Sequence, residues 1–253
     1  MVSEVRNRRG LVSYDFKGKS VADDIRTKYG YDGDFLQIYG ENKGTVVHKW
    51  HHYLPLYDRY FSPYRRSDIR FLEIGVSEGG SLHMWRRYFG AEATIFGVDI
   101  NPNCAQFDGV AAQVRIGSQA DPAFLAGVVA EMGGVDVVLD DGSHHMDHVR
   151  ASLKALFPLL SIGGLYMIED LHTAYWRSYG GSFTGKENFF SDIKTMIDDM
   201  HHWYHPGEIS NPDLAASMAG LHVHDSIVVI DKQPVYPPAQ SKVGLSTKTK
   251  PAP

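Results

Sequence analysis

The sequence is poor in cysteine, with Cys104 the only one among 253 residues. A single thiol excludes an internal disulfide and a multi-cysteine zinc site, and it is typical of a reducing compartment. No apolar stretch is long enough to cross a bilayer. The basic N-terminal stretch is not followed by the apolar core of a secretory signal. These features predict a cytoplasmic protein that does not bind membranes.

The sequence also lacks an excess of positive charge, since its formal net charge is −5. This balance argues against a general nucleic-acid-binding protein, which usually carries a basic excess. The hydrophobic fraction of 43% and the charged fraction of 22% are ordinary for a globular protein. No internal repeat is visible, and the length suits one large α/β domain with extensions.

Residues 135–170 predict two parallel strands joined by a helix. The apolar runs Val135–Leu139 and Leu165–Ile168 are each short enough for a buried strand. Between them, apolar residues recur at helical spacing before a glycine pair that predicts the helix stop: Val149, Leu153, Leu156, Leu160, Gly163 and Gly164. Because the crossover of such a unit is almost always right-handed, both strands end at the same edge of the sheet.

Each of these strands ends in two acids, Asp140-Asp141 in the first and Glu169-Asp170 in the second. Neighbouring strands lie about 4.8 Å apart, so the carboxylates converge at the edge where open α/β sheets bind ligands. They repel one another unless a cation neutralises them, and oxygen ligands favour Mg²⁺, Mn²⁺ or Ca²⁺ over zinc. Asp141, Glu169 and Asp170 are therefore predicted metal ligands. Alternatively, Asp140 and Glu169 only cap loops or accept hydrogen bonds from neighbouring amides.

His144 is the candidate general base. It lies three residues after Asp141, on the turn that opens the next helix. A neutral imidazole there can accept a proton from a hydroxyl whose acidity a metal has raised. The alternative is an ordinary surface or core histidine, but the neighbouring carboxylates favour the catalytic role.

The rest of the chain alternates strands and helices, which predicts a doubly wound parallel sheet. Expected strands cover residues 70–76, 94–98 and 112–116, and expected helices cover residues 82–89 and 123–132. Two later β-branched runs, residues 221–223 and 226–230, are joined tightly and suit a terminal antiparallel hairpin. We therefore predict an α/β, Rossmann-like, doubly wound seven-stranded sheet with a terminal antiparallel hairpin.

The first of these strands runs into a glycine turn at residues 77–81, SEGGS. Such a turn lets a ligand approach the backbone closely. It lacks the full dinucleotide fingerprint, because Ser77 stands at the second glycine position. Asp99 ends the next strand, where an acid can hydrogen-bond to ribose hydroxyls. Alternatively, Asp99 caps the Asn101-Pro102 turn.

The flanking segments give weaker patterns. Ser20 can cap a helix that begins near Val21, and residues 29–43 are expected to form a loop. The aromatic stretch 48–66 is either a helix packed on the sheet edge or a lid over a ligand. Aromatic residues after Asp170 either stack on an organic acceptor or cover the sheet edge, and a helix is expected from about residue 186 to residue 202.

Four segments together resemble the class I S-adenosylmethionine-dependent methyltransferases. They are FLEIGVSEGGSLHMW, FGVDI, VVLDDGSHHMDHV and GGLYMIEDLHTAYW. More narrowly, they resemble the metal-dependent sugar O-methyltransferases of macrolide tailoring, of the mycinamicin and tylosin type, and the related rhamnosyl O-methyltransferases. The resemblance covers about residues 29–232. Its specific part is the tandem of DGSH and IED motifs, whereas the glycine loop is generic.

The resemblance implies that Asp141, Glu169 and Asp170 bind Mg²⁺ (or Mn²⁺). It also implies that His144 is the general base and that Asp141 is a catalytic residue as well as a metal ligand. The residues assigned to the cofactor S-adenosylmethionine are Glu73, Gly75, Ser81, Asp99, Ser118, Gln119, Asp140, His51 and Tyr53. The implied domains are an N-terminal arm and helical lid (1–66), a cofactor-binding core (67–232) with an acceptor loop near 171–210, and a disordered tail (233–253).

The implied function is Mg-dependent transfer of a methyl group from S-adenosylmethionine to a hydroxyl of a (deoxy)sugar, on a glycosylated natural product. The implied partners are a small-molecule glycoside acceptor and further copies of the chain in a homo-oligomer, with no nucleic acid and no membrane. One alternative is a metal-dependent O-methyltransferase for a catechol or another non-sugar diol. Others are an NAD-dependent oxidoreductase, disfavoured by the imperfect glycine fingerprint, and a non-catalytic partner protein that keeps the fold.

Overall fold

The computed structural model describes residues 20–185 and 188–244. The predicted arm up to residue 19 and the end of the predicted tail, residues 245–253, lie outside this part of the chain. The sheet contains β1 (Arg70–Ile74), β2 (Thr94–Asp99), β3 (Gln113–Ile116), β4 (Val135–Asp140), β5 (Leu160–Ile168), β6 (Met218–Val223) and β7 (Val228–Lys232). Its order is β3-β2-β1-β4-β5-β7-β6. β1 to β5 are parallel, and β7 pairs antiparallel with both β5 and β6. This confirms the Rossmann-like sheet with its terminal hairpin.

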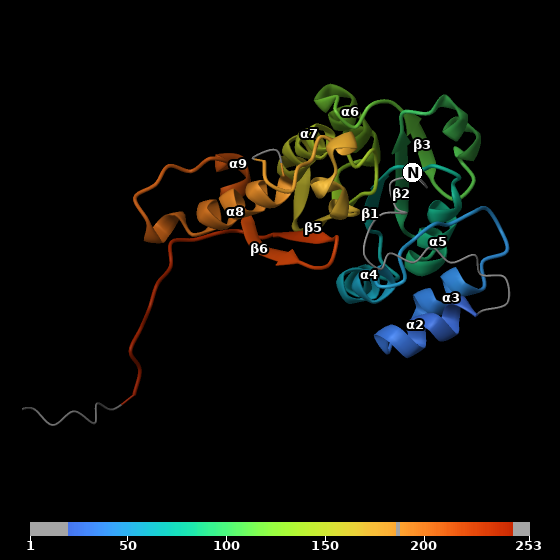
Figure 1. Ribbon diagram of the computed structural model, residues 1–253, viewed down its shortest axis with the longest axis horizontal. Helices are drawn as coiled ribbons and strands as arrows, with labels where there is room; N and C mark the ends of the chain where they lie inside the picture. The colour runs from blue at the N-terminus through green and yellow to red at the C-terminus, as the bar shows by residue number, and fades with distance from the viewer. Residues whose placement is uncertain (1–19, 186–187, 245–253) are drawn as a thin grey trace, which may run out of the picture.

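Helices cover both faces of the sheet (Figure 1). They are α2 (Val21–Tyr29), α3 (Asp34–Gly40), α4 (Tyr53–Phe61), α5 (Gly80–Phe89), α6 (Pro122–Met132), α7 (Met146–Leu156), α8 (Phe189–Met200) and α9 (Pro212–Ala215). The first four share one apolar cluster with alternate strand residues such as Phe71 and Val137. The last four share a second cluster with the strand neighbours Leu72 and Val138. Because successive strand side chains point to opposite faces, the buried strands are apolar on both sides.

The predicted loop over residues 29–43 is wrong in part, because α3 forms there. Phe35, Leu36 and Ile38 of this short helix are buried, and the Phe35 ring stacks on the Tyr88 ring at 3.9 Å between centroids. Glycines and tyrosines around the helix obscure its period in the sequence. By contrast, α2 begins where expected, and Ser20 Oγ accepts a hydrogen bond of 3.2 Å from the Asp23 amide.

The end of the crossover helix also differs from the prediction. α7 ends at Leu156, a 3₁₀ turn containing Pro158 follows, and Leu160 already belongs to β5. The register of β5 shifts against β4 at this point. The pair Gly163-Gly164 therefore lies within the strand at an irregularity and does not stop the helix, as glycines in strands often do.

The aromatic stretch at 48–66 contains α4, which packs on the sheet through Tyr57 and Phe61. The Phe61 ring lies 5.7 Å from that of Phe71 in β1. A lid role for this stretch, and the domain boundaries in general, stay predictions. The helix expected from residue 186 is α8, and residues 186–187 lie outside the described residues.

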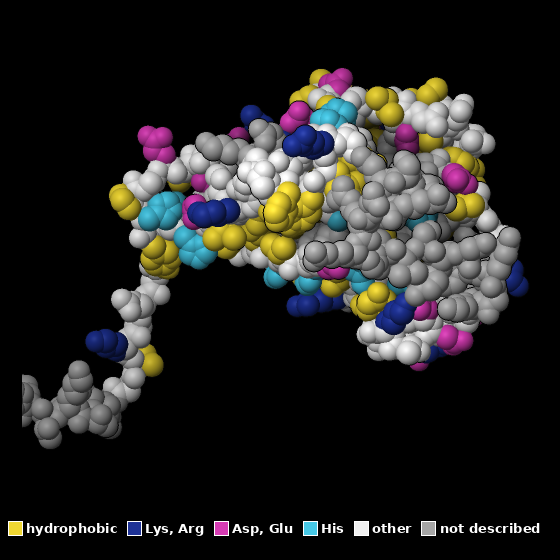
Figure 2. All heavy atoms as spheres, viewed as in Figure 1, with side chains coloured by type: hydrophobic (Ala, Val, Ile, Leu, Met, Phe, Trp, Pro, Cys, Tyr) yellow, Lys and Arg dark blue, Asp and Glu magenta, His cyan; other side chains and the backbone are white. Residues whose placement is uncertain are grey.

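Among the helices of the described ranges, none is both long and apolar enough to cross a membrane. On the face drawn in Figure 2, the Lys and Arg side chains lie apart from one another and among acidic ones.

Candidate active site

Three residues that the sequence singles out lie close together at the carboxyl edge of the sheet. One ligand atom from each of Asp141, His144 and Asp170 lies within 4.8 Å of the others. His144 Nε2 is 3.9 Å from Asp141 Oδ1 and 3.6 Å from Asp170 Oδ2. The register explains this proximity, since Asp140 is paired with Ile168 at the ends of β4 and β5. The two carboxylates are a donor pair that suits one divalent ion, and the imidazole lies beside them.

Left-handed backbone at two of these residues aims their side chains. His144 and Asp170 both have φ of 56°, although neither is glycine. In an extended strand, Asp170 would point away from Glu169, and the turn removes this restriction. Thr173, which the sequence does not single out, connects both turns. Its Oγ1 lies 2.7 Å from the Asp170 carbonyl oxygen and 3.2 Å from that of His144.

The third predicted ligand, Glu169, is outside this group and is engaged elsewhere. Its Oε1 accepts a hydrogen bond of 2.5 Å from the Tyr57 hydroxyl, and its Oε2 lies 3.0 Å from Lys49 Nζ. Lys49 Nζ is also 2.5 Å from Asp141 Oδ2. Burial lowers the pKa of Lys49, but Asp141 and Glu169 outweigh this effect and raise it overall. A buried ammonium group is therefore part of the site.

Lys49 and Tyr57 were missed by sequence reasoning. They lie 92 and 112 residues before the acids that they contact. The available signal was a lysine within an aromatic segment, HKWHHY, and that pattern does not indicate which acid it meets.

Asp140 has partners of its own on the other face of the sheet. It is buried, and its carboxylate accepts hydrogen bonds from Tyr166 (2.9 Å), Gln119 (3.1 Å) and Ser152. Burial raises the pKa of Asp140. Gln119 Oε1 also accepts a bond of 2.7 Å from the Ser143 amide, next to His144. Contacts of Asp140 and Gln119 with a cofactor stay predictions.

The predicted methionine side of the cofactor site is built on β1 and α5. Glu73 is buried and accepts hydrogen bonds from Ser81 Oγ (2.8 Å) and Trp85 Nε1 (2.9 Å). Burial raises the pKa of Glu73 to about 7. Gly75 has φ of 97°, and a Cβ there would lie 2.1 Å from the Asp141 carbonyl oxygen. Glycine at this position thus lets the tips of β1 and β4 approach each other.

The predicted ribose and adenine residues lie at the ends of β2 and β3. Asp99 Oδ2 accepts hydrogen bonds of 2.9 Å from the amides of Val76 and Ser77. Its Oδ1 accepts one of 2.8 Å from the Asn101 amide, which is the alternative cap. Ser118 Oγ accepts one of 3.1 Å from the Ala120 amide. Asp99 therefore holds the glycine turn beside which a ribose is predicted.

His51 and Tyr53, predicted near the cofactor, point to different neighbours. His51 Nδ1 lies 2.7 Å from Asp24 Oδ2 on α2. The Tyr53 hydroxyl donates a 2.7 Å hydrogen bond to Asp170 Oδ1. Tyr53 thus contacts the group of Asp141, His144 and Asp170, whereas His51 contacts α2.

Aromatic rings continue from this group along the loop after β5. The Tyr179 ring lies 6.4 Å from the His144 ring and 5.8 Å from the Trp176 ring. His172 lies 4.9 Å from Trp176 and 5.6 Å from Trp50, between centroids. We call Trp50, His172, Trp176 and Tyr179 the aromatic row. It lies beside the candidate base.

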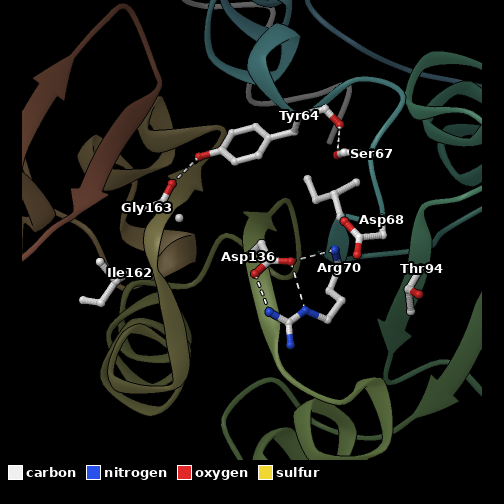
Figure 3. A pocket seen from close by; sticks show the side chains of 10 residues that line it. Tyr64, Ser67, Asp68, Arg70, Thr94, Asp136, Ile162 and Gly163 are labelled. Carbon is white, nitrogen blue, oxygen red and sulfur yellow. Dashed lines mark hydrogen bonds and ion pairs between the residues drawn. The ribbon is translucent and has the colours of Figure 1, made fainter.

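A hollow with a volume of about 580 Å³ lies elsewhere, at the amino ends of the strands (Figure 3). Its polar groups bond mainly to one another. Arg70 Nη2 lies 2.6 Å from Asp136 Oδ1, and the Tyr64 hydroxyl donates a bond of 2.8 Å to the Gly163 carbonyl. These contacts join β1, β4 and β5 and present no group suited to methyl transfer.

Comparisons with known proteins identify the fold and its relatives. Residues 72–171 match the family model described as a methyltransferase domain. The chain is 36% identical over 220 residues to an 8-demethyl-8-(2-methoxy-alpha-L-rhamnosyl)-tetracenomycin-C 3'-O-methyltransferase of Streptomyces olivaceus, covering 82% of this chain and 56% of the relative. It is 37% identical over 194 residues to the mycinamicin VI 2''-O-methyltransferase of Micromonospora griseorubida, covering 72% and 48%.

A solved structure shares the fold. It is the MycE methyltransferase of the mycinamycin biosynthetic pathway in complex with Mg, SAH and mycinamycin VI. It superposes with a TM-score of 0.71 at 34% identity, covering 80% of this chain and 54% of that one. The chain thus spans about half the length of the relatives that it matches. With residues 72–171 matched by the family model and the fold shared with MycE, this part of the chain is a methyltransferase domain.

Proposed function

We propose that this chain transfers a methyl group from S-adenosylmethionine to a hydroxyl of a (deoxy)sugar on a glycosylated natural product, with a divalent ion. The observation that carries the proposal is the meeting of Asp141, His144 and Asp170 at the carboxyl edge of the sheet. The relatives support the acceptor class, since they are named as O-methyltransferases of rhamnosyl tetracenomycins and of mycinamicin VI. The methyltransferase domain matched over residues 72–171 disfavours the NAD-dependent alternative.

The residues present fit a divalent ion such as Mg²⁺ or Mn²⁺. Asp141 and Asp170 offer negatively charged oxygens to the ion, and His144 lies beside them, where its nitrogen stays available as the proton acceptor. Glu169, the further predicted ligand, comes directly after Ile168, the β5 residue that pairs with Asp140. Its carboxylate is bonded to Tyr57 and Lys49. When bound, a divalent ion supplies a Lewis acid that makes an alcohol more acidic, and S-adenosylmethionine supplies an electrophilic methyl group.

The residues of the chain position the proton transfer. His144 Nε2 is the atom that faces Asp141 and Asp170, so it is placed to accept the proton of an acceptor hydroxyl. The two carboxylates then stabilise the imidazolium that forms. Thr173 and Gln119 hold the backbone on the two sides of His144. Tyr53 holds Asp170 through its hydroxyl.

The remaining elements orient the two substrates. Asp99 holds the glycine turn, at the helix N-terminus where such folds bind polar ligand groups. The aromatic row offers ring faces on which the apolar face of a sugar can lie. Holding acceptor and methyl group in line is worth up to about 7–11 kcal/mol of the barrier.

The test is an acceptor panel with the full chain, S-adenosylmethionine and Mg²⁺, read by mass spectrometry. We expect methylation of glycosylated macrolides or polyketides and no methylation of their aglycones. Methylation of catechols alone would refute the sugar acceptor and favour the non-sugar alternative. We expect excess EDTA to abolish turnover and added Mg²⁺ to restore it, and full turnover in EDTA would refute the metal requirement.

We further propose that the chain works in the cytoplasm as a homo-oligomer. The cytoplasm is supported by its one cysteine, Cys104, which is free and buried. The homo-oligomer is supported only by the family resemblance. Light scattering of the purified chain checks the assembly, and a monomer at micromolar concentration would contradict it.

A further inference from the structure

The turn that carries Tyr179 lies directly on the residue that follows the candidate base. A Cβ added to Gly180 would lie 2.8 Å from Cε1 and 3.2 Å from Nε2 of the His145 ring. The residue before Gly180 is Tyr179, whose ring centroid lies 6.4 Å from that of His144. That histidine directly precedes His145 in the chain. The packing of Gly180 on the His145 ring therefore sets how Tyr179 lies relative to the candidate base.

The turn is closed by its own backbone and leaves no room for a side chain at Gly180. The Gly180 amide donates a hydrogen bond of 3.0 Å to the Arg177 carbonyl. The next amide, that of Gly181, donates one of 2.9 Å to the Trp176 carbonyl. Gly180 has φ of 72°, a conformation that glycine adopts without steric cost. Any larger residue there would add backbone strain and would also meet the ring of His145.

His145 is equally fixed, because α7 begins on it. Its carbonyl accepts hydrogen bonds of 2.9 Å and 3.0 Å from the amides of His148 and Val149, and its amide donates one of 3.3 Å to Ser143 Oγ. Among the residues that the structure describes, nothing forms a hydrogen bond with the buried Nδ1 of the His145 ring. A buried polar atom without a partner costs stability, which indicates that the ring is kept here for its shape.

We propose that Tyr179 contacts the acceptor sugar and that His145 is the positioning residue that holds it there through Gly180. This rests on the proposed function, because the sugar is the acceptor of the same reaction. Tyr179 is half-buried, so part of its ring stays open to a ligand. Its neighbour in the aromatic row, Trp176, lies 5.8 Å away between centroids. Losing one aromatic contact typically changes affinity by about 2- to 10-fold.

The experiment measures steady-state kinetics of the full chain with a glycosylated macrolide or polyketide that the wild type methylates in the acceptor panel. The variants are Gly180→Ala, which adds a methyl group against the ring, and His145→Ala, which removes the ring. We expect both to raise KM for the acceptor by about 2- to 10-fold. The affinity for S-adenosylhomocysteine, measured by calorimetry, should stay unchanged. The matched control is Gly133→Ala, which should keep wild-type kinetics, because Gly133 has φ of 75° and a Cβ there meets nothing within 4 Å.

A second comparison tests whether His145 acts through Tyr179. Tyr179→Leu alone should raise KM for the acceptor over the same range. Adding His145→Ala to Tyr179→Leu should then change KM little, because the ring that His145 positions is already gone. Full additivity of the two effects would overturn the proposal, since it would mean that His145 acts on the acceptor by another route.

Wild-type KM in both Gly180→Ala and His145→Ala would also overturn the proposal, and so would a parallel loss of affinity for S-adenosylhomocysteine. If Gly180→Ala does not give a folded circular-dichroism spectrum, the KM of His145→Ala decides. If neither variant folds, the contact holds the fold and not the acceptor, and the proposal is wrong. Methylation of no glycoside by the wild type would instead refute the proposed function, and this proposal with it.

Discussion

Replacing His144 by asparagine tests the base assignment with little disturbance of the backbone. His144 has φ of 56°, and asparagine is among the residues that tolerate this conformation. Alanine there would combine loss of the base with backbone strain. The side chain is 17% exposed, and asparagine fills part of the space that the imidazole occupies. We therefore expect His144→Asn to fold with nearly wild-type stability.

The expected effect on turnover follows from the position of Nε2 between Asp141 and Asp170. Losing a positioned general base typically costs about 10²- to 10⁴-fold in rate, which corresponds to about 3–5 kcal/mol in the barrier. The affinity for S-adenosylhomocysteine should change little, since the cofactor is assigned to β1, β2 and the glycine turn. The assay combines steady-state kinetics with calorimetry of the cofactor product.

The control is His83→Asn, at an exposed histidine on α5, which should keep wild-type kinetics. Unchanged turnover in His144→Asn would refute the role of His144 as base. A parallel loss of kcat and of cofactor affinity would also count against it, because that result indicates a disturbed fold and not a missing proton acceptor.

Two further substitutions test the parts that support this histidine. Gly75→Ala should destabilise the fold by at least about 1–3 kcal/mol from its left-handed backbone and weaken Mn²⁺ binding, because the added Cβ meets the Asp141 carbonyl. Thermal unfolding checks this against Gly127→Ala, where a Cβ meets nothing within 4 Å, and equal effects of both would contradict it. Burial raises the pKa of Glu73 from 4.5 to about 7. Between these two pH values the folded chain keeps a proton on Glu73 that the unfolded chain loses, so the stability of the fold decreases as the pH rises from 4.5 to about 7. At about 1.4 kcal/mol per pKa unit, Glu73 lowers the free energy of unfolding by up to about 3 kcal/mol over this pH range. The free energy of unfolding of Glu73→Gln, measured in urea, should therefore depend less steeply on pH than that of wild type. An identical slope in both would contradict this.

The buried strands of the fold could be predicted from short stretches of sequence. The strands ending at Asp99, Asp140 and Ile168 are short apolar runs buried on both faces, and such runs can be recognised from the sequence alone. α3 was missed because its seven residues are held by packing on α5 and not by their own periodicity. The predicted start of β5 is too late, because the first residues of this strand follow directly on the helix and include two glycines.

The candidate site divides in the same way. Asp141, His144 and Asp170 were predicted because they follow strand ends in sequence, and the topology alone brings strand ends together. The orientation of Glu169 was not predictable, since it depends on Lys49 and Tyr57, which precede it by 120 and 112 residues. The prediction that Glu169 binds the metal was based on the repulsion among the acids, with a metal ion as the neutralising charge. A protein cation was an equally good answer to that repulsion.

The backbone at Asp170 explains why two adjacent acids can end one strand and still serve different purposes. Glu169 directly follows β5 and directs its carboxylate inward, to Tyr57 and Lys49. Asp170 adopts φ of 56° and ψ of 30°, which turns its carboxylate toward His144 and Tyr53. Aspartate is one of the few residues besides glycine that visits this region readily, and its short side chain keeps the carboxylate near the turn. The order glutamate then aspartate therefore fits a long reach into the protein followed by a short turn toward the site.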